Sequence, residues 1–296
     1  PAEVGEAIKA GSAFDAFDAY LVTGGYPRLV LDLARSGASV ADFVRGSLAD
    51  PYSPLVSTAR FSLDAEFPEP QAAYQVLAAI GANDKANPGF MDLSSAVGES
   101  EAGSAQTAVT RALKTLTEVK GLVERETPAW ASPRTKLRRY RVKDPYLRFW
   151  FRYVESNVER VFRGRSDLVI SRWERDWQSW RGRSVEPVLR EGLERLAVHE
   201  PTLATVERVQ PWWTRDGSVE VDWVASSMSA TELIGSIKWR ERGTLNASEV
   251  RELRHQTAVV PRAANARLAA VCPDGENIPG VDVVVGAEGL LRAWRA

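Results

Sequence analysis

Cysteine and histidine are nearly absent from this sequence of 296 residues, which has one cysteine, Cys272, and two distant histidines, His199 and His255. One cysteine allows no internal disulfide, and no Cys/His cluster has the spacing of a zinc site. No apolar run approaches the roughly 18 residues of a membrane-spanning helix, and the N-terminus lacks the basic start and apolar stretch of a signal peptide. These absences argue against thiol catalysis, zinc and a membrane partner, and they predict a cytoplasmic protein.

The overall charge of −1 conceals a strong asymmetry along the chain. Residues 1–104 hold six Lys/Arg and fourteen Asp/Glu, whereas residues 130–165 hold eleven Lys/Arg and three acids. A basic segment in a nearly neutral chain indicates a surface that faces a polyanion, although such runs are also typical of solvated faces. The hydrophobic share of 44% is that of an ordinary globular protein, and the length is sufficient for two or three domains.

The first segment, residues 1–64, has a helical pattern that ends in the Pro- and Ser-rich string DPYSPLVST. Within it, YLVTGGYPRLV (residues 20–30) places two glycines and a proline between apolar flanks. These residues predict a sharp turn, and the plainest interpretation of that turn is a helix–helix corner.

The second segment, residues 65–143, predicts three helices over Glu69–Ile80, Asp92–Val97 and Ser104–Lys120. Two strands follow, GLVERE and LRRYRVKD, with a basic loop between them. Three short helices and a hairpin are the order of a winged helix-turn-helix domain, in which the third helix can enter a major groove while the wing contacts phosphates.

The third of these helices has an apolar face and a polar face. The predicted apolar face consists of Ala108, Leu113, Leu116 and Val119. The predicted outward face consists of Gln106, Thr107, Thr110, Arg111 and Lys114. The basic residues of the wing are Arg134, Lys136, Arg138, Arg139 and Arg141. These two sets predict that duplex DNA is a partner, and the alternative is a winged helix that serves only as a protein–protein module.

The third segment, residues 144–183, carries two aromatic stripes at helical spacing. The first consists of Tyr146, Phe149, Trp150 and Tyr153, and the second of Trp173, Trp177 and Trp180. Packing between domains explains such stripes better than base stacking does. The tryptophan face is therefore expected to form a seam with another domain, with a protein partner or with a second copy in a homo-oligomer.

The last segment, residues 184–296, changes to the order α-β-β-β-α-β with a further strand and helix. Strand alternation places Glu220 and Asp222 on one face of the second strand, and Ser236 and Lys238 on one face of the third. The sequence therefore predicts a multidomain α+β protein that is mostly helical at first and ends in an α/β domain.

Two resemblances follow from these strings. The VD and S-x-K pair in this element order resembles the PD-(D/E)XK nuclease superfamily. The strings YLVTGGYPRLV, LTEVKGLVERETP, YRVKDPYLRFWFRYV, QPWWTRDGSVEVDWVA and LIGSIKW together resemble the C-terminal half of the archaeal-type AAA-like ATPases, which also occur in bacteria. This resemblance implies a helical lid-like segment (1–64), a winged helix-turn-helix (65–143), an aromatic-rich helical connector (144–183) and a restriction-endonuclease-like domain (184–296).

The sequence departs from that family in its nucleotide site. The string GxxxxGK[ST], which would cradle phosphates, does not occur. The resemblance therefore implies that the chain begins within the lid, that ATP belongs to a missing N-terminal domain of the parent protein, and that this chain needs no cofactor of its own.

The second departure is at the nuclease-like motif, where Ser236 replaces the acid of the family's Glu-x-Lys. A neutral hydroxyl is a poor ligand for magnesium, so the implied site of Asp222, Ser236, Lys238 and Glu186 is expected to be degenerate, with weak magnesium binding at most. Lys238 is then expected to pair with Asp222 or with a phosphate.

A carboxylate from elsewhere would change this expectation, and Glu186, Glu220 and Glu249 are the candidates. Three functions follow: a non-cleaving DNA-associated module, a Mg/Mn-dependent endonuclease with a migrated carboxylate, and a protein interaction module. The first is the expected function.

Overall fold

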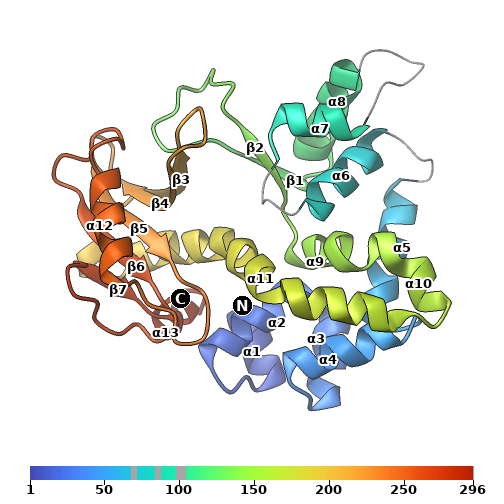
Figure 1. Ribbon diagram of the computed structural model, residues 1–296. Coiled ribbons are helices and arrows are strands. Elements are labelled where there is room, and N and C mark those ends of the chain that lie inside the picture. The colour runs from blue at the N-terminus through green and yellow to red at the C-terminus, as the bar shows by residue number, and fades with distance from the viewer. Residues whose placement is uncertain (68–71, 84–87, 98–104, 296) are drawn as a thin grey trace.

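Short helices joined by tight corners form the N-terminal part of the chain in the computed structural model, which describes residues 1–67, 72–83, 88–97 and 105–295 (Figure 1). The first five helices are α1 (Ala2–Ile8), α2 (Ala13–Thr23), α3 (Pro27–Ser36), α4 (Val40–Ala49) and α5 (Pro54–Glu66). Serine hydroxyls cap α2, α4 and α5. The hydroxyls of Ser12, Ser39 and Ser53 each accept a hydrogen bond from a backbone N–H in the first turn of the helix.

The glycines of YLVTGGYPRLV form the helix–helix corner that their composition predicts. Gly24 and Gly25 both have positive φ, at 61° and 78°, and Pro27 opens α3. A Cβ atom at Gly24 would lie 2.8 Å from Cβ of Tyr146, in the first turn of α9 (Pro145–Tyr153). Glycine therefore allows α9 to approach this corner, and two of the strings that define the family resemblance pack against each other.

The next part contains three helices followed by an antiparallel hairpin. The helices are α6 (Ala72–Ala82), α7 (Phe90–Val97) and α8 (Ala105–Lys114), which continues into a π-helical turn (Thr115–Val119). The strands are β1 (Val123–Glu126) and β2 (Arg139–Val142). The expected helix starts at Glu69 and Ser104 lie outside the described residues.

The π-helical turn explains one wrong prediction about α8. Val119 was expected on the apolar face, but it is 77% exposed, whereas Val109, Leu113 and Leu116 are buried. A π-helical turn holds more residues than an α-helical turn and therefore rotates the following side chains away from the stripe. A 3.6-residue period does not continue through such a turn.

A single long helix crosses the predicted domain boundary between residues 183 and 184. The elements of this part are α9, a 3₁₀ turn (Glu155–Asn157), α10 (Val158–Phe162) and α11 (Ser166–Ala197). Helix α11 continues for 32 residues through Pro187. The connector and the C-terminal domain therefore share one helix. No helix in the described ranges combines the length and apolar composition that crossing a membrane requires.

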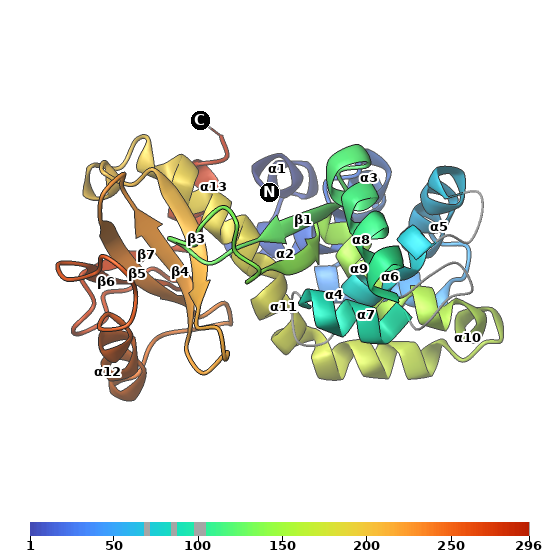
Figure 2. The ribbon, with the colours of Figure 1, turned by 90° about the horizontal axis from the view of Figure 1, so that it is seen from above.

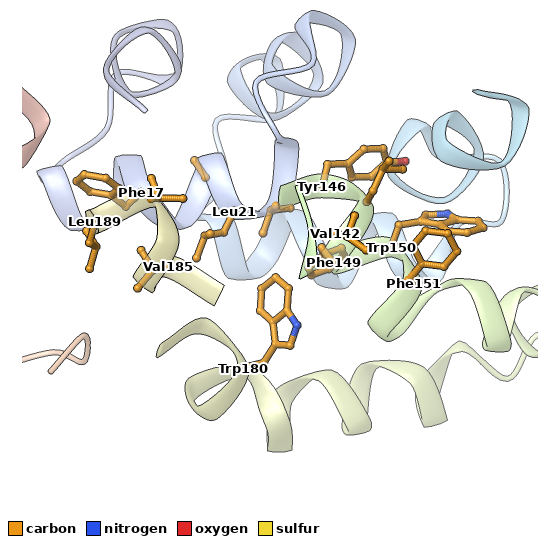
Figure 3. Packing of buried hydrophobic residues seen from close by; sticks show 14 of the residues in the cluster. Phe17, Leu21, Val142, Tyr146, Phe149, Trp150, Phe151, Trp180, Val185 and Leu189 are labelled. Atoms are coloured by element: carbon orange, nitrogen blue, oxygen red, sulfur yellow. The ribbon is translucent and has the colours of Figure 1, made fainter. Parts of the chain in front are cut away.

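The tryptophan stripe of α11 is a seam inside the chain. The side chains of Trp173 and Trp180 are 2% and 6% exposed. The ring of Trp180 lies 5.8 Å from that of Phe149 of α9 (Figure 3). It lies 5.6 Å from the ring of Tyr153 of the same helix. Other side chains of the same chain cover the rings of Trp173 and Trp180, so these rings are unavailable to a second copy. Of the three tryptophans only Trp177 is half-buried.

The C-terminal part is a five-stranded mixed sheet with helices on both faces (Figure 2). Its elements are β3 (Arg208–Trp213), β4 (Glu220–Ser226), β5 (Thr231–Ile237), α12 (Ala247–Gln256), β6 (Arg267–Val271), β7 (Val283–Val285) and α13 (Ala287–Arg292), preceded by a 3₁₀ turn (Pro201–Leu203). The strand order is β3-β4-β5-β6-β7, antiparallel as far as β5 and parallel beyond it. The predicted element order is confirmed.

One core joins the N-terminal helices to this sheet. Phe17 of α2 lies in the same buried cluster as Leu189 of α11 (Figure 3). Leu290 of α13 belongs to this cluster too, and the ring centroids of Phe17 and Trp239 are 5.2 Å apart. A buried ion pair between Arg181 and Asp18, 2.9 Å long, fixes α11 to α2. The first helices are therefore part of the platform on which the C-terminal sheet rests.

The pairing of Gly235 with Trp223 generates a prediction about stability. These residues face each other across β4 and β5, and a Cβ atom at position 235 would lie 2.0 Å from the indole of Trp223, which is fully buried. We expect Gly235→Ala to lower the free energy of unfolding by about 2 kcal/mol or more in a urea titration, because the indole has no space into which it can move.

Gly46→Ala is the matched control. Gly46 lies exposed within α4, and a Cβ atom at this position would have no neighbouring atom within 4 Å. This substitution is expected to raise stability by about 0.5–1 kcal/mol, since alanine favours helix. Equal effects of the two substitutions would contradict the close contact at Gly235.

Candidate functional site

Strand pairing brings Asp222 of β4 beside Ser236 of β5. The register pairs Trp223 with Gly235, so the residues next to them are neighbours across the ladder. Oδ2 of Asp222 accepts a hydrogen bond of 2.8 Å from the Ser236 hydroxyl and one of 2.7 Å from the backbone N–H of Ile237. Ser236 stands at the position where an acid was expected, and its hydroxyl holds the carboxylate of Asp222.

Lys238 follows β5 directly and pairs with a residue that the sequence did not predict as its partner. Its Nζ lies 2.9 Å from Oε1 of Glu249, and both side chains are 27% exposed. The expected pairing of Lys238 with Asp222 is wrong. Glu249 is held within reach of Lys238 because it is part of a capping box at the start of α12. Its other carboxylate oxygen accepts a hydrogen bond from the backbone N–H of Asn246.

The acids that were candidates to replace the missing carboxylate each have another partner. Glu220 forms two hydrogen bonds with the guanidinium of Arg139, at 2.6 and 3.1 Å. Glu186 lies 3.5 Å from Arg190, one turn along α11. Glu220 and Glu249 are therefore neutralised by cations of the protein itself, whereas Glu186, among the described residues, has only this longer contact with Arg190.

The residues present do not fit a divalent cation. Within the described ranges, no group of three or more Asp, Glu, His or Cys side chains is arranged to hold a metal ion. Magnesium requires several oxygen ligands in octahedral geometry at about 2.1 Å. Here Asp222 already accepts two hydrogen bonds on one oxygen. The cavity of about 180 Å³ beside it is lined by Lys238 and by Glu220, Glu249 and Glu252, and Glu220 and Glu249 are paired with Arg139 and Lys238. The arrangement is a hydrogen-bonded polar pocket.

A buried charge network lies behind this pocket, and sequence reasoning missed it. Nη2 of Arg190 donates to Glu126 of β1 at 2.7 Å, and its Nη1 donates to the carbonyl of Asp222 at 3.1 Å. Arg141 of β2 reaches Glu126 at 3.1 Å and Glu124 at 2.6 Å. The charges of Arg190 and Arg141 outweigh the effect of burial and lower the pKa of Glu126. One signal was available, because VERE and RYRV place opposite charges across the hairpin.

Arg148 extends this network from α9. Its side chain is buried, and Nη1 donates to the carbonyl of Ser184 in α11 at 2.9 Å. Burial lowers the pKa of Arg148 to about 9, which leaves the guanidinium charged at neutral pH. The network therefore holds the hairpin, α9, α11 and β4 together at one point.

The predicted DNA-contacting residues divide into two groups. The polar face of α8 is exposed as expected, with Gln106, Thr107, Thr110, Arg111 and Lys114 all outward. In the predicted wing only Arg134 and Lys136 are exposed. Arg139 and Arg141 were expected to contact phosphates, but both lie in β2 and form ion pairs with glutamates. Arg138 is half-buried.

The loop of the predicted wing is anchored to the C-terminal sheet. The N–H of Ala129 donates to the carbonyl of Pro211 in β3 at 2.9 Å, and the indole of Trp130 donates to Thr231 at 2.8 Å. The guanidinium of Arg262 covers the Trp130 ring at 4.2 Å. The hairpin loop is therefore a connection between two parts of the molecule.

Residues 150–253 match DUF234, a family described as archaeal and bacterial proteins of unknown function. The match begins in α9 and ends in α12, so it includes Asp222, Lys238 and Glu249. An uncharacterised protein of Methanocaldococcus jannaschii is 30% identical over 130 residues, which are 44% of this chain and 28% of that protein. The chain thus spans less than a third of the length of this relative. No solved structure matches this chain.

Glu186 generates a prediction about pH. Burial, followed by the nearby charge of Asp222, raises the pKa of Glu186 from 4.5 to about 8. Between these values the folded protein holds a proton that the unfolded chain has released, so stability falls as the pH rises from about 4.5 to about 8. We expect Glu186→Gln to reduce this fall, measured as the melting temperature at pH 5 and at pH 8.

Glu191→Gln removes the same charge from an exposed position on α11 and is the control. It is expected to leave the wild-type pH profile in place. A Glu186→Gln profile parallel to that of the wild type would show that this carboxyl does not titrate in the range.

Proposed function

We propose that this chain is a DNA-associated module in which α8 contacts duplex DNA and the site around Asp222 does not cleave it. The observation that carries the proposal is the two-sided character of α8. Its buried side anchors it in the core, and its exposed side presents polar and basic groups only. By resemblance, the module would be the C-terminal part of an archaeal-type AAA-like ATPase, with the three helices and hairpin as its winged helix.

The dimensions of α8 support this role. Ten residues form a helix about 15 Å long, and a major groove about 12 Å wide admits one α-helix. The exposed side offers Gln106 for base edges and Arg111 and Lys114 for phosphates. Arg111 and Lys114 also lie in the last turn of the helix, where a basic group is favoured.

Additional phosphate contacts fall to the loop that follows β1. Arg134 and Lys136 are its exposed basic residues, whereas Arg139 and Arg141 are held by glutamates. Four phosphate contacts, two from α8 and two from this loop, contribute about −4 to the slope of the logarithm of affinity against that of salt concentration.

The salt slope tests the proposal. We expect wild-type protein to bind a fluorescein-labelled 20-base-pair duplex in anisotropy titrations at 50–200 mM salt, and Arg111→Ala/Lys114→Ala to make the slope shallower by about two, because two phosphate contacts are lost. The pair Arg35→Ala/Arg292→Ala removes equal charge from exposed sites on α3 and α13 and is expected to have little effect. Equal losses in both double variants would argue against α8.

The non-cleaving part of the proposal rests on the ligand set. A nuclease of the kind that this region resembles needs acids around a metal and a lysine free to orient the nucleophile. In this chain Asp222 is held by Ser236, and Lys238 is held by Glu249. These contacts support a site that has become structural.

Supercoiled plasmid is expected to remain intact with wild-type protein and 10 mM Mg²⁺ or Mn²⁺. Ser236→Glu restores a second carboxylate beside Asp222, and we expect it to bind Mn²⁺ at least tenfold more tightly than the wild type in calorimetry. Ser236→Ala controls for loss of the hydroxyl. Nicking by the wild type that disappears in Asp222→Ala and in Lys238→Ala would instead establish an endonuclease.

A further inference from the structure

A large arginine-lined cleft separates the helical part of the molecule from the turn between β3 and β4. Its volume is about 950 Å³, and its walls come from α7, β2, α9, α11 and that turn. The arginines that line it are Arg138, Arg139, Arg152, Arg172 and Arg215. Five arginine residues from four different parts of the chain line one space, and Arg138 also lines a neighbouring cavity beside Trp130 and Met228.

Two of these arginines already have close carboxylate partners. Arg139 forms a bidentate pair with Glu220, and Arg152 reaches Asp176 at 2.7 Å. Such pairs fix the side chains in place. These two arginines therefore form a rigid wall of the cleft.

The other three arginines are not closely neutralised. Across the described part of the chain, Arg138 and Arg215 form no ion pair, and Arg172 reaches Asp176 only at 4.0 Å. Asp176 also forms an ion pair with Arg175, at 3.2 Å. Burial, followed by the like charge of Arg152, lowers the pKa of Arg172.

The acids that line the cleft accept hydrogen bonds from backbone N–H groups and hydroxyls of their own loops. Asp92 accepts the N–H of Gly89 at 2.8 Å. Asp216 accepts from the hydroxyl of Thr214 and from both the N–H and the hydroxyl of Ser218, and these hydrogen bonds lower its pKa to about 2. Neither carboxylate turns toward the unpaired guanidinium groups.

The cleft is suited to phosphates and poorly suited to bases. The one aromatic residue among its lining residues, Trp213, is 4% exposed, and the guanidinium of Arg139 covers its ring at 4.3 Å. Base stacking on a single strand needs an accessible aromatic face. Guanidinium groups without such a face are matched to phosphate oxygens, which they bind in a fork geometry.

We propose that this cleft binds the phosphodiester backbone of duplex DNA through Arg138, Arg172 and Arg215. The inference rests on the proposed DNA association, to which it adds a second contact surface, formed between the helical part and the C-terminal sheet. Contacts with the backbone carry no sequence information, so this surface strengthens binding to all duplexes equally.

The test compares two triple variants in anisotropy titrations with the labelled 20-base-pair duplex. Arg138→Gln/Arg172→Gln/Arg215→Gln is expected to bind at least tenfold more weakly at 100 mM salt, with a slope shallower by about three. Arg35→Gln/Arg251→Gln/Arg292→Gln removes the same charge from exposed sites outside the cleft and is expected to change affinity less than threefold. The affinity for a second duplex of unrelated sequence is expected to fall by the same factor in the first triple variant.

Arg215→Gln alone guards against a folding defect in the triple variant. Its side chain is exposed, and the single substitution is expected to make the slope shallower by about one while leaving the melting temperature unchanged. Poly-glutamate is expected not to displace the duplex. Displacement of the duplex by poly-glutamate at equal charge concentration would identify an acidic peptide as the occupant and overturn the proposal.

The possible failures are distinguishable. If the wild type binds duplex and the cleft variant matches its control while the α8 variant loses affinity, the cleft proposal is wrong and the proposed function stands. If wild-type protein binds no duplex at all, both are wrong.

Discussion

The guanidinium of Arg190 is the contact on which the arrangement of this molecule depends. It projects from α11, pairs with Glu126 of β1 and donates to the main-chain carbonyl of Asp222 in β4. A buried arginine and a buried glutamate each lose hydration on folding, and only a partner at close range compensates for that loss. The hairpin, the long helix and the sheet therefore have to assemble together, because each supplies part of this contact.

The position of the hairpin follows from that contact. Because β1 is held against α11, the loop beyond it reaches the C-terminal sheet, where the indole of Trp130 donates to Thr231 at the start of the central strand β5. Two arginines of β2 are used as internal counter-ions in the same assembly. A basic run read along the sequence thus divides into structural cations and exposed ones. Among the five basic residues of the predicted wing, Arg134 and Lys136 are exposed, whereas Arg138 and Arg139 line the arginine-lined cleft.

The parts of the fold that sequence could predict are those in which one residue type settles the local geometry. Gly24 and Gly25 marked a corner, and strand alternation in the last third gave the correct element order. The continuity of α11 was not predictable in the same way, since Pro187 and a change in pattern near Ser184 both indicate a break, and packing against α9 and the sheet overrides them. The π-helical turn that ends at Val119 left no compositional sign.

Within the candidate site, spacing alone placed Glu220 and Asp222 on one face of β4 and Ser236 and Lys238 on one face of β5, and only the resemblance to the nuclease superfamily joined Asp222 and Ser236 in one site. The sequence did not place Lys238 against Glu249, since that contact depends on where a capped helix begins relative to the end of a strand. Ion pairs between distant segments, such as Arg139 with Glu220, depend on the tertiary fold and have no local signature.

The unbroken course of α11 has a mechanical consequence. Thirty-two residues at 1.5 Å each follow a path of about 48 Å that underlies both the aromatic seam and the sheet. The helix changes direction along this path (Figure 2), and Pro187 within it removes one backbone hydrogen bond, so the two halves face different layers without a loop between them. A displacement of the N-terminal helices that pack on α11 therefore reaches the sheet through continuous helix and not through a flexible linker.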